Sequence, residues 1–139
     1  QGWICRNGTL EWKNGVLALT PQANLGRNAR PFLAHSGLDV AGPVTLRIQV
    51  RAKHGGGCAF SWRTKQEKDF SPQNSLTVPW SDSSDWQEVT ALLPVKGRLM
   101  HLRIASARET EGLEIKSISI APPDGDATNF IFSTTPRAP

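Results

Sequence analysis

The stretch Val44-Thr-Leu-Arg-Ile-Gln-Val-Arg-Ala52 decides the fold class. Its apolar residues occupy every second position, with polar or basic residues between them. Successive side chains of an extended strand point to opposite faces, so this alternation predicts a strand with one buried and one hydrated face. No window of a dozen residues elsewhere shows the apolar spacing of an amphipathic helix. The sequence therefore predicts an all-β chain.

Further runs of strand character flank this stretch on both sides. They fall at Leu10 to Lys13, Val16 to Thr20, Pro31 to His35, Ala59 to Thr64, Ser75 to Val78, Gln87 to Leu93, Leu99 to Ser106 and Leu113 to Ala121. Asn14-Gly15 separates the first two runs and predicts a tight hairpin turn, because both residues accept positive φ. Short strands at this regular spacing predict an antiparallel β-sandwich of the jelly-roll type.

The length of 139 residues fits one domain. We expect the sandwich to span residues 1–122 and residues 123–139 to form a C-terminal loop or linker with a short strand at Asn129 to Phe132. From Ser133 onward the chain is expected to be disordered. The apolar runs are far shorter than the roughly 20 residues of a membrane-spanning helix, so no membrane association is expected.

The glycines at 55–57 predict a turn between the strands at 44–53 and 58–65, and two registers are open. Pairing Lys53 with Cys58 would bury Arg63, whereas pairing Lys53 with Ala59 sends Phe60 and Trp62 inward. The second register is favoured because burying an unpaired arginine is costly. It aligns five cations on one outer face: Arg47, Arg51, Lys53, Arg63 and Lys65. In the last long strand the apolar parity changes, which predicts a bulge near Lys116-Ser117.

The net charge is +4, and residues 27–68 alone carry eight basic against two acidic residues. Arginine outnumbers lysine, and its planar fork of donors suits carboxylate, sulfate or phosphate groups. We therefore predict that an anionic partner binds the face bearing Arg47, Arg51, Arg63 and Lys65, with Lys68 at its edge. Trp80, in a polar loop, is a candidate for stacking on a sugar ring. Ordinary surface charge that keeps a domain soluble is the alternative.

The sequence contains none of the common catalytic or nucleotide-binding motifs. His35, His54 and His101 are scattered, and the cysteines lack metal-ligand spacing, so we expect no enzyme activity, no metal and no cofactor. A nucleic-acid partner is disfavoured because the basic residues are not interleaved with a stacking series of aromatic residues. Cys5 and Cys58 form either one disulfide or two buried free thiols.

Several strings resemble a jelly-roll carbohydrate-binding module. They are Gly2-Trp3, Asn14-Gly-Val-Leu17, Val44-Thr-Leu-Arg-Ile48, Trp86-Gln-Glu-Val89 and Glu114-Ile-Lys-Ser-Ile-Ser-Ile120. Three others look like the β-sandwich module on the C-terminal side of some bacterial polysaccharide sulfatases: Asn28-Ala-Arg-Pro-Phe32, Trp62-Arg-Thr-Lys-Gln-Glu-Lys-Asp-Phe70 and Leu93-Pro-Val-Lys-Gly-Arg98.

The resemblance implies a non-catalytic module that binds a sulfated polysaccharide and is tethered to a secreted or periplasmic enzyme. The alternative is a structural appendage of a sulfatase without a ligand of its own. Many such modules carry an aspartate beside a structural calcium where this chain has Lys116, so we expect no calcium there. The cysteines are not part of the family pattern, and their joint appearance favours a Cys5–Cys58 disulfide.

Overall fold

The computed structural model describes residues 2–21, 31–51, 56–80, 85–106 and 113–132. These residues form two antiparallel six-stranded sheets and no helix. The first sheet contains, in spatial order, β1 (Ile4–Arg6), β4 (Phe32–His35), β10 (Arg98–Ser106), β7 (Gly56–Thr64) and β8 (Ser75–Trp80), with β5 (Val40–Ala41) also pairing with β10. The second contains β2 (Gly8–Lys13), β3 (Val16–Pro21), β11 (Leu113–Ala121), β6 (Val44–Arg51) and β9 (Gln87–Leu93), with β12 (Thr128–Ile131) also pairing with β11. The predicted β-sandwich is confirmed.

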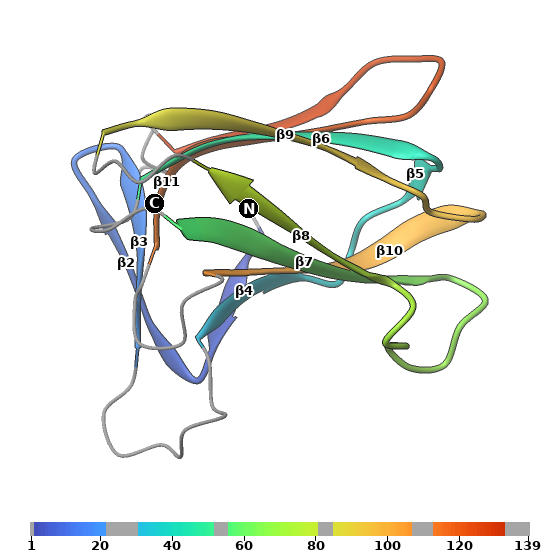
Figure 1. Ribbon diagram of the computed structural model, residues 1–139, viewed down its shortest axis with the longest axis horizontal. Coiled ribbons are helices and arrows are strands. Elements are labelled where there is room, and N and C mark those ends of the chain that lie inside the picture. The colour runs from blue at the N-terminus through green and yellow to red at the C-terminus, as the bar shows by residue number, and fades with distance from the viewer. Residues whose placement is uncertain (1, 22–30, 52–55, 81–84, 107–112, 133–139) are drawn as a thin grey trace, which may run out of the picture.

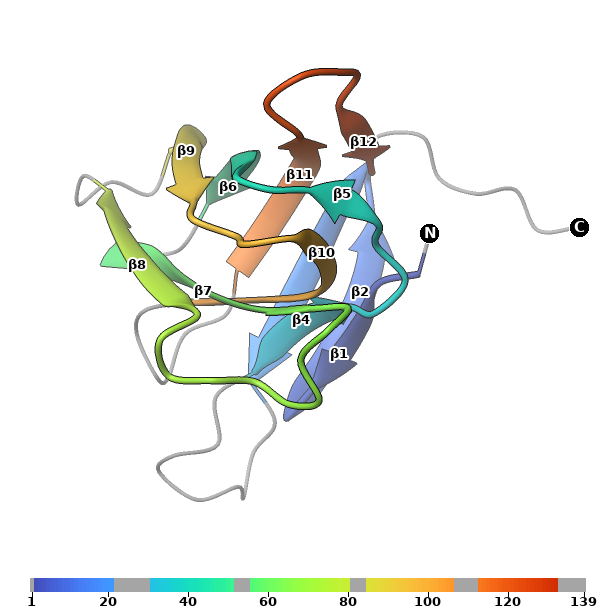
Figure 2. The same ribbon diagram turned by 90° about the vertical axis from the view of Figure 1, so that its right-hand side faces the viewer.

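The two sheets lie face to face, and the core fills the space between them (Figures 1 and 2). In β6 the apolar residues that predicted a strand are the ones that are buried: Val44, Leu46, Ile48 and Val50 are at most 1% exposed. Each strand contributes its apolar face to one shared core, which a chain of this length can build without metal or disulfides. The outward faces of both sheets therefore remain for other roles.

The predicted hairpin between residues 44–53 and 58–65 does not form. Strand β6 pairs with β9 and β11 in the second sheet, whereas β7 pairs with β8 and β10 in the first. Lys53 lies outside the described residues, so its predicted partner is not seen. The facing is nevertheless as expected, since Phe60 and Trp62 are buried and Arg63 points outward. The period-two pattern fixes which side chains face the core, and a strand of either sheet can satisfy it.

Two local predictions are confirmed. The hairpin joins β2 to β3 through Asn14 and Gly15, whose φ angles of 55° and 76° are both positive. The register of β11 against β6 shifts between Ile115 and Ser117, which is the predicted bulge. The bulge keeps Ile115 and Ile118 both in the core although their sequence parity differs.

The C-terminal strand is part of the sandwich. Strand β12 pairs with β11 from Ile131 to Thr128, and the side chain of Phe132 is fully buried. The indole Nε1 of Trp12 donates a hydrogen bond to the carbonyl oxygen of Phe132 at 2.8 Å. The packed unit thus extends to Phe132, beyond the expected boundary at residue 122. The expectation of disorder from residue 133 falls outside the described residues.

The predicted disulfide is wrong, because Cys5 and Cys58 are free thiols. Cys5 lies in β1 and Cys58 in β7, and two strands, β4 and β10, lie between them in the same sheet. Three strand spacings of about 4.8 Å separate the two backbones, whereas a disulfide requires Cα atoms within roughly 7 Å. Cys58 serves instead as a fully buried apolar residue of the core.

Candidate functional site

The cations predicted to share one face lie on two opposite faces. Arg47 and Arg51 are on the outward face of the second sheet, whereas Arg63 and Lys65 are on the outward side of the first. Lys68 lies in the segment 65–74, which joins β7 to β8, and is exposed. The single basic face predicted from the sequence is therefore wrong. It depended on pairing β6 with β7, which the fold places in different sheets.

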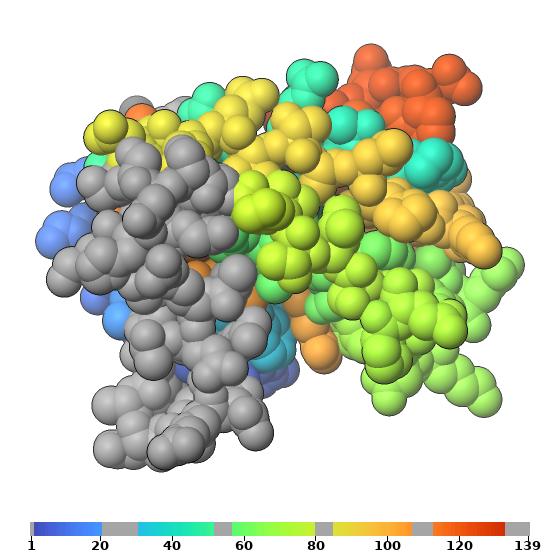
Figure 3. Space-filling view, viewed as in Figure 1, coloured from blue at the N-terminus to red at the C-terminus, as the bar shows by residue number. Residues whose placement is uncertain are grey.

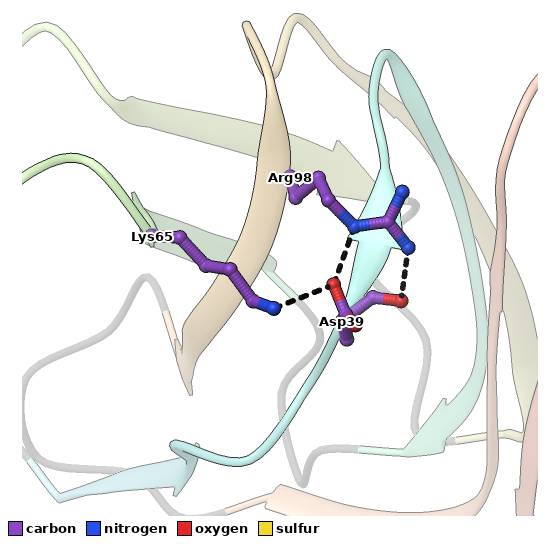
Figure 4. A network of polar contacts seen from close by, with 3 residues as sticks. All are labelled: Asp39, Lys65 and Arg98. Atoms are coloured by element: carbon purple, nitrogen blue, oxygen red, sulfur yellow. Dashed lines mark hydrogen bonds and ion pairs between the residues drawn. The ribbon is translucent and has the colours of Figure 1, made fainter.

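Most of these cations contact groups of the protein itself. Arg51 forms an ion pair with Glu114 at 3.0 Å, and Arg63 donates to the backbone oxygen of Glu67 at 2.7 Å. Lys65 lies 3.2 Å from the carboxylate of Asp39, which Arg98 also contacts (Figure 4). Hydrogen bonds from Arg98 and then Lys65 hold the pKa of Asp39 below its usual range. The charge of Lys65 is thus partly balanced before any ligand arrives.

The tryptophans do not form an exposed platform in the described residues. Trp62 is 2% exposed and belongs to the core, as predicted. Trp86 is half-buried, with the guanidinium of Arg51 4.6 Å and the ammonium of Lys116 4.4 Å from its ring centre. Trp80 is the last residue of β8 and not a loop residue, and its side chain lies outside the described part of the chain. Its predicted stacking role stays a prediction.

The outward face of the first sheet carries a shallow groove of about 230 Å³. Its floor is made of small side chains, since Ala59 and Ser61 of β7 lie beside Ala105 of β10. Larger or polar side chains border that floor: Phe32, Arg103, Ser75 and Thr77. The hydroxyls of Ser61 and Thr77 form no hydrogen bond with any described residue. We call this feature the Arg103 groove.

Arg103 is held between two aromatic rings. Its guanidinium carbon lies 4.9 Å from the ring centre of Phe32 and 3.7 Å from that of Phe70. Phe70 belongs to the segment 65–74, which turns over the outer side of the sheet, and its ring also meets His101 at 4.7 Å. The Nε atom of Arg103 is buried and has no hydrogen-bond partner among the described residues. Burial lowers the pKa of this arginine, and the nearby charge of Asp69 opposes the shift.

Arg103, Phe70 and Phe32 were absent from the predicted site. Their sequence signal is weak, because an outward arginine in a strand is common and Phe70 stands in a polar segment. Only the pairing of β10 with β4 and β7, together with the fold of segment 65–74, brings them together. The segment lies on the right of Figure 1, coloured green.

The described residues show no group of three or more histidine, cysteine, aspartate or glutamate side chains arranged to hold a metal ion. Within the same residues, no helix has the length and apolar character needed to cross a membrane. The chemistry concentrated at the Arg103 groove is cationic, aromatic and hydroxylic.

No protein-family profile matches the chain, and no curated protein matches it. Solved structures do. A mutant of the family 29 carbohydrate-binding module CBM29-2 complexed with cellulohexaose is 18% identical, with 87% of this chain and 80% of that chain covered and a TM-score of 0.59. Another mutant of the module, complexed with mannohexaose, is 17% identical over 87% and 81%, with a TM-score of 0.59. A family 4 module is 12% identical over 94% of each chain, with a TM-score of 0.57. The chain therefore has the β-sandwich fold of carbohydrate-binding modules.

Proposed function

We propose that the protein is a non-catalytic carbohydrate-binding module that recognises an anionic, sulfated polysaccharide through the Arg103 groove. The observation that carries the proposal is Arg103 itself, held between Phe32 and Phe70 beside a groove lined with hydroxyl groups. Carbohydrate binding is supported by the fold shared with modules of families 29 and 4.

The composition of the groove supports a saccharide ligand. A sugar presents hydroxyl groups around a ring with an apolar face, and the groove offers hydroxyls at Ser61 and Thr77 beside an aromatic side chain at Phe32. An open groove on a sheet also leaves room for a polymer to continue past either end. Polysaccharide is therefore a better match than a small molecule enclosed on all sides.

The charges around the groove support an anionic ligand. Arg103 lies within it, Arg6 is the strand partner of Phe32, and Arg63 lies on the outward face of the neighbouring strand β7. Arg103 is half-buried and lines the groove, so its planar guanidinium can present donors to a sulfate or carboxylate. Of the residues first expected to bind, Arg63 belongs to the same sheet as the groove, whereas Arg47 and Arg51 belong to the other sheet.

The finer parts of the proposal concern the natural setting of the module. We propose that it is tethered to a larger polysaccharide-active enzyme that is secreted or periplasmic and of the bacterial sulfatase type. The strings that resemble modules of such sulfatases support this setting, and a sulfated ligand is consistent with it. In the same setting, a structural appendage without a ligand is the alternative.

The test compares a sulfated galactan with its desulfated form by isothermal titration calorimetry at low and high salt. We expect the sulfated form to bind more tightly and its affinity to fall with salt, because salt screens exposed charges within roughly 8 Å at physiological ionic strength. Arg103→Ala should weaken binding about tenfold or more, since hydrogen bonds to charged groups contribute roughly 1.5–3 kcal/mol.

Arg47→Ala is the matched control, because it removes the same charge from an exposed residue on the opposite face. It should leave the affinity within about twofold. If both variants lost the same affinity for the sulfated galactan, the effect would be one of net charge and not of the groove. If the wild type bound both galactans with equal affinity, the proposal of an anionic ligand would be wrong. Absence of binding to any polysaccharide would favour the structural appendage.

A further inference from the structure

A second hollow, larger than the Arg103 groove, opens at one end of the sandwich. It has a volume of about 390 Å³ and lies between segment 65–74 and the turn that connects β9 to β10. Both segments are at the right-hand end in Figures 1 and 3. The volume is within the range of roughly 300–1,000 Å³ that is common for small-ligand sites.

Glu67 fixes the shape of this hollow. Its Oε1 atom accepts hydrogen bonds from the backbone nitrogen and the hydroxyl of Thr64, both at 3.0 Å. The side-chain nitrogen of Asn74 donates to both carboxylate oxygens, at 3.0 and 2.9 Å. These bonds, those of Thr64 first, lower the pKa of Glu67, so the carboxylate is ionised at neutral pH. The network ties the start of segment 65–74 to its end and places a negative charge in the wall.

Other polar side chains around the hollow have hydrogen-bond donors and acceptors that no described residue uses. The side chains of Gln66, Gln73 and Lys96 line it and form no hydrogen bond or ion pair with any described residue. Deeper in the hollow, Trp62 contributes the small exposed part of its indole. One carboxylate, one ammonium and two amides of this kind can both accept from and donate to hydroxyl groups. The formal charges of Glu67 and Lys96 cancel, so the hollow lacks the positive excess of the Arg103 groove.

We propose that this hollow is a second saccharide site, which takes a neutral sugar unit through its vicinal hydroxyls. The inference rests on the proposed function for the class of ligand, but it uses different residues and concerns a neutral unit in place of an anionic one. The ionised carboxylate of Glu67 would repel a sulfate or uronate, whereas a neutral ring brings only hydroxyls. A module with both sites would hold the charged stretch of a polysaccharide on the sheet and an uncharged unit at the end of the sandwich.

The two sites share segment 65–74. Phe70 covers Arg103 on the outer side of the sheet, while Gln66, Glu67 and Gln73 face the hollow. Ser75 borders the groove directly after Asn74, which borders the hollow. One polysaccharide chain could therefore run from the groove to the hollow, and two contacts on one chain raise the overall affinity through their high effective concentration.

The test is an NMR titration of the ¹⁵N-labelled protein with two neutral probes, cellulohexaose and mannohexaose, at low and high salt. We expect at least one probe to shift the amide signals of residues 64–67, 73–74 and 95–97, with an affinity that salt leaves unchanged. The double variant Gln73→Ala/Lys96→Ala should weaken this binding about tenfold or more, through the loss of direct hydrogen bonds. Neither side chain supports the fold by a hydrogen bond to a described residue.

Gln49→Ala is the matched control, since Gln49 is an exposed glutamine on the outward face of the second sheet. It should bind the neutral probe as the wild type does, because it leaves both segments that line the hollow unchanged. Absence of any shift around the hollow with both probes overturns the inference, as does unchanged binding by the double variant. The sulfated galactan experiment tests the Arg103 groove independently. Its result can therefore support the groove when the second site is wrong, or contradict the groove when the second site is right.

Discussion

The ionisation of Glu67 affects the stability of segment 65–74, which borders both candidate sites. Its pKa is lower in the folded protein than the ordinary value of 4.5, because Thr64 and Asn74 hydrogen-bond the charged form. A lowered folded pKa contributes stability that is complete above the unfolded value and is lost as the pH falls through the folded value. Glu67 should therefore stabilise segment 65–74 at neutral pH and cease to do so in acid.

This reasoning predicts the behaviour of Glu67→Gln. At pH 7 we expect the variant to be less stable than the wild type by about 1 kcal/mol, because the amide keeps one acceptor oxygen but loses the charge and the second acceptor. The difference should shrink as the pH falls below 4.5, because the wild type then becomes protonated while the amide does not titrate. Urea unfolding of both proteins across this pH range measures it. Glu88→Gln, at an exposed position of β9, is the control, and a pH-independent difference for Glu67→Gln would contradict the argument.

The β2–β3 hairpin shows how much one element depends on its turn. Gly15 has a φ of 76°, a conformation that a β-branched residue adopts only with strain. Gly15→Val should lower the free energy of unfolding by about 1–3 kcal/mol, whereas Asn14→Gly should be nearly neutral because glycine accepts positive φ freely. Chemical unfolding of the two variants distinguishes turn strain from a general effect of mutating the loop, and equal costs for both would argue against strain.

At the level of elements, local sequence patterns predicted the positions of the strands better than they predicted which strands pair with one another. The parity change in Leu113 to Ala121 was sufficient to predict the bulge, since both apolar sets must reach one core. The alternation in Val44 to Ala52 showed which side chains are buried, but it is the same in either sheet, so it could not show that β6 and β7 separate. Strands β1 and β5 are too short to carry a period. The Arg103 groove depends on contacts between distant segments, which no local pattern reports.

For the whole molecule, the consequence is a distribution of charge over two faces instead of one. Arg51 and Lys116 flank Trp86 on the second sheet, and Arg51 is paired with Glu114. On the first sheet, the guanidinium of Arg103 lies against the rings of Phe32 and Phe70, and its Nε lacks a described partner. Comparing variants that each remove one arginine from a different face therefore shows which face binds the ligand, because the change in net charge is the same in both.

The integrity of the sandwich also depends on its C-terminal strand. Phe132 is fully buried, its ring packs edge-on against Trp12 at 5.3 Å, and its carbonyl accepts the indole hydrogen bond of Trp12. Phe130 adds a similar contact with Trp3 at 5.3 Å. A chain that ends at Ala121 loses all of these interactions and the pairing of β12 with β11.

We therefore predict that truncation after Ala121 destabilises the fold by several kcal/mol, because removing one buried phenylalanine side chain alone costs about 3–5 kcal/mol. A chain that ends at Phe132 keeps every contact named above and is the reference for the comparison. Phe132→Ala in the full chain should lower the free energy of unfolding by about 3 kcal/mol or more. This variant separates the effect of losing the side chain from the effect of losing the whole strand. Urea unfolding followed by tryptophan fluorescence measures all three, since Trp12 and Trp3 contact this strand. If the chain ending at Ala121 unfolded at the same urea concentration as the reference, the C-terminal segment would be a linker after all, as the sequence suggested.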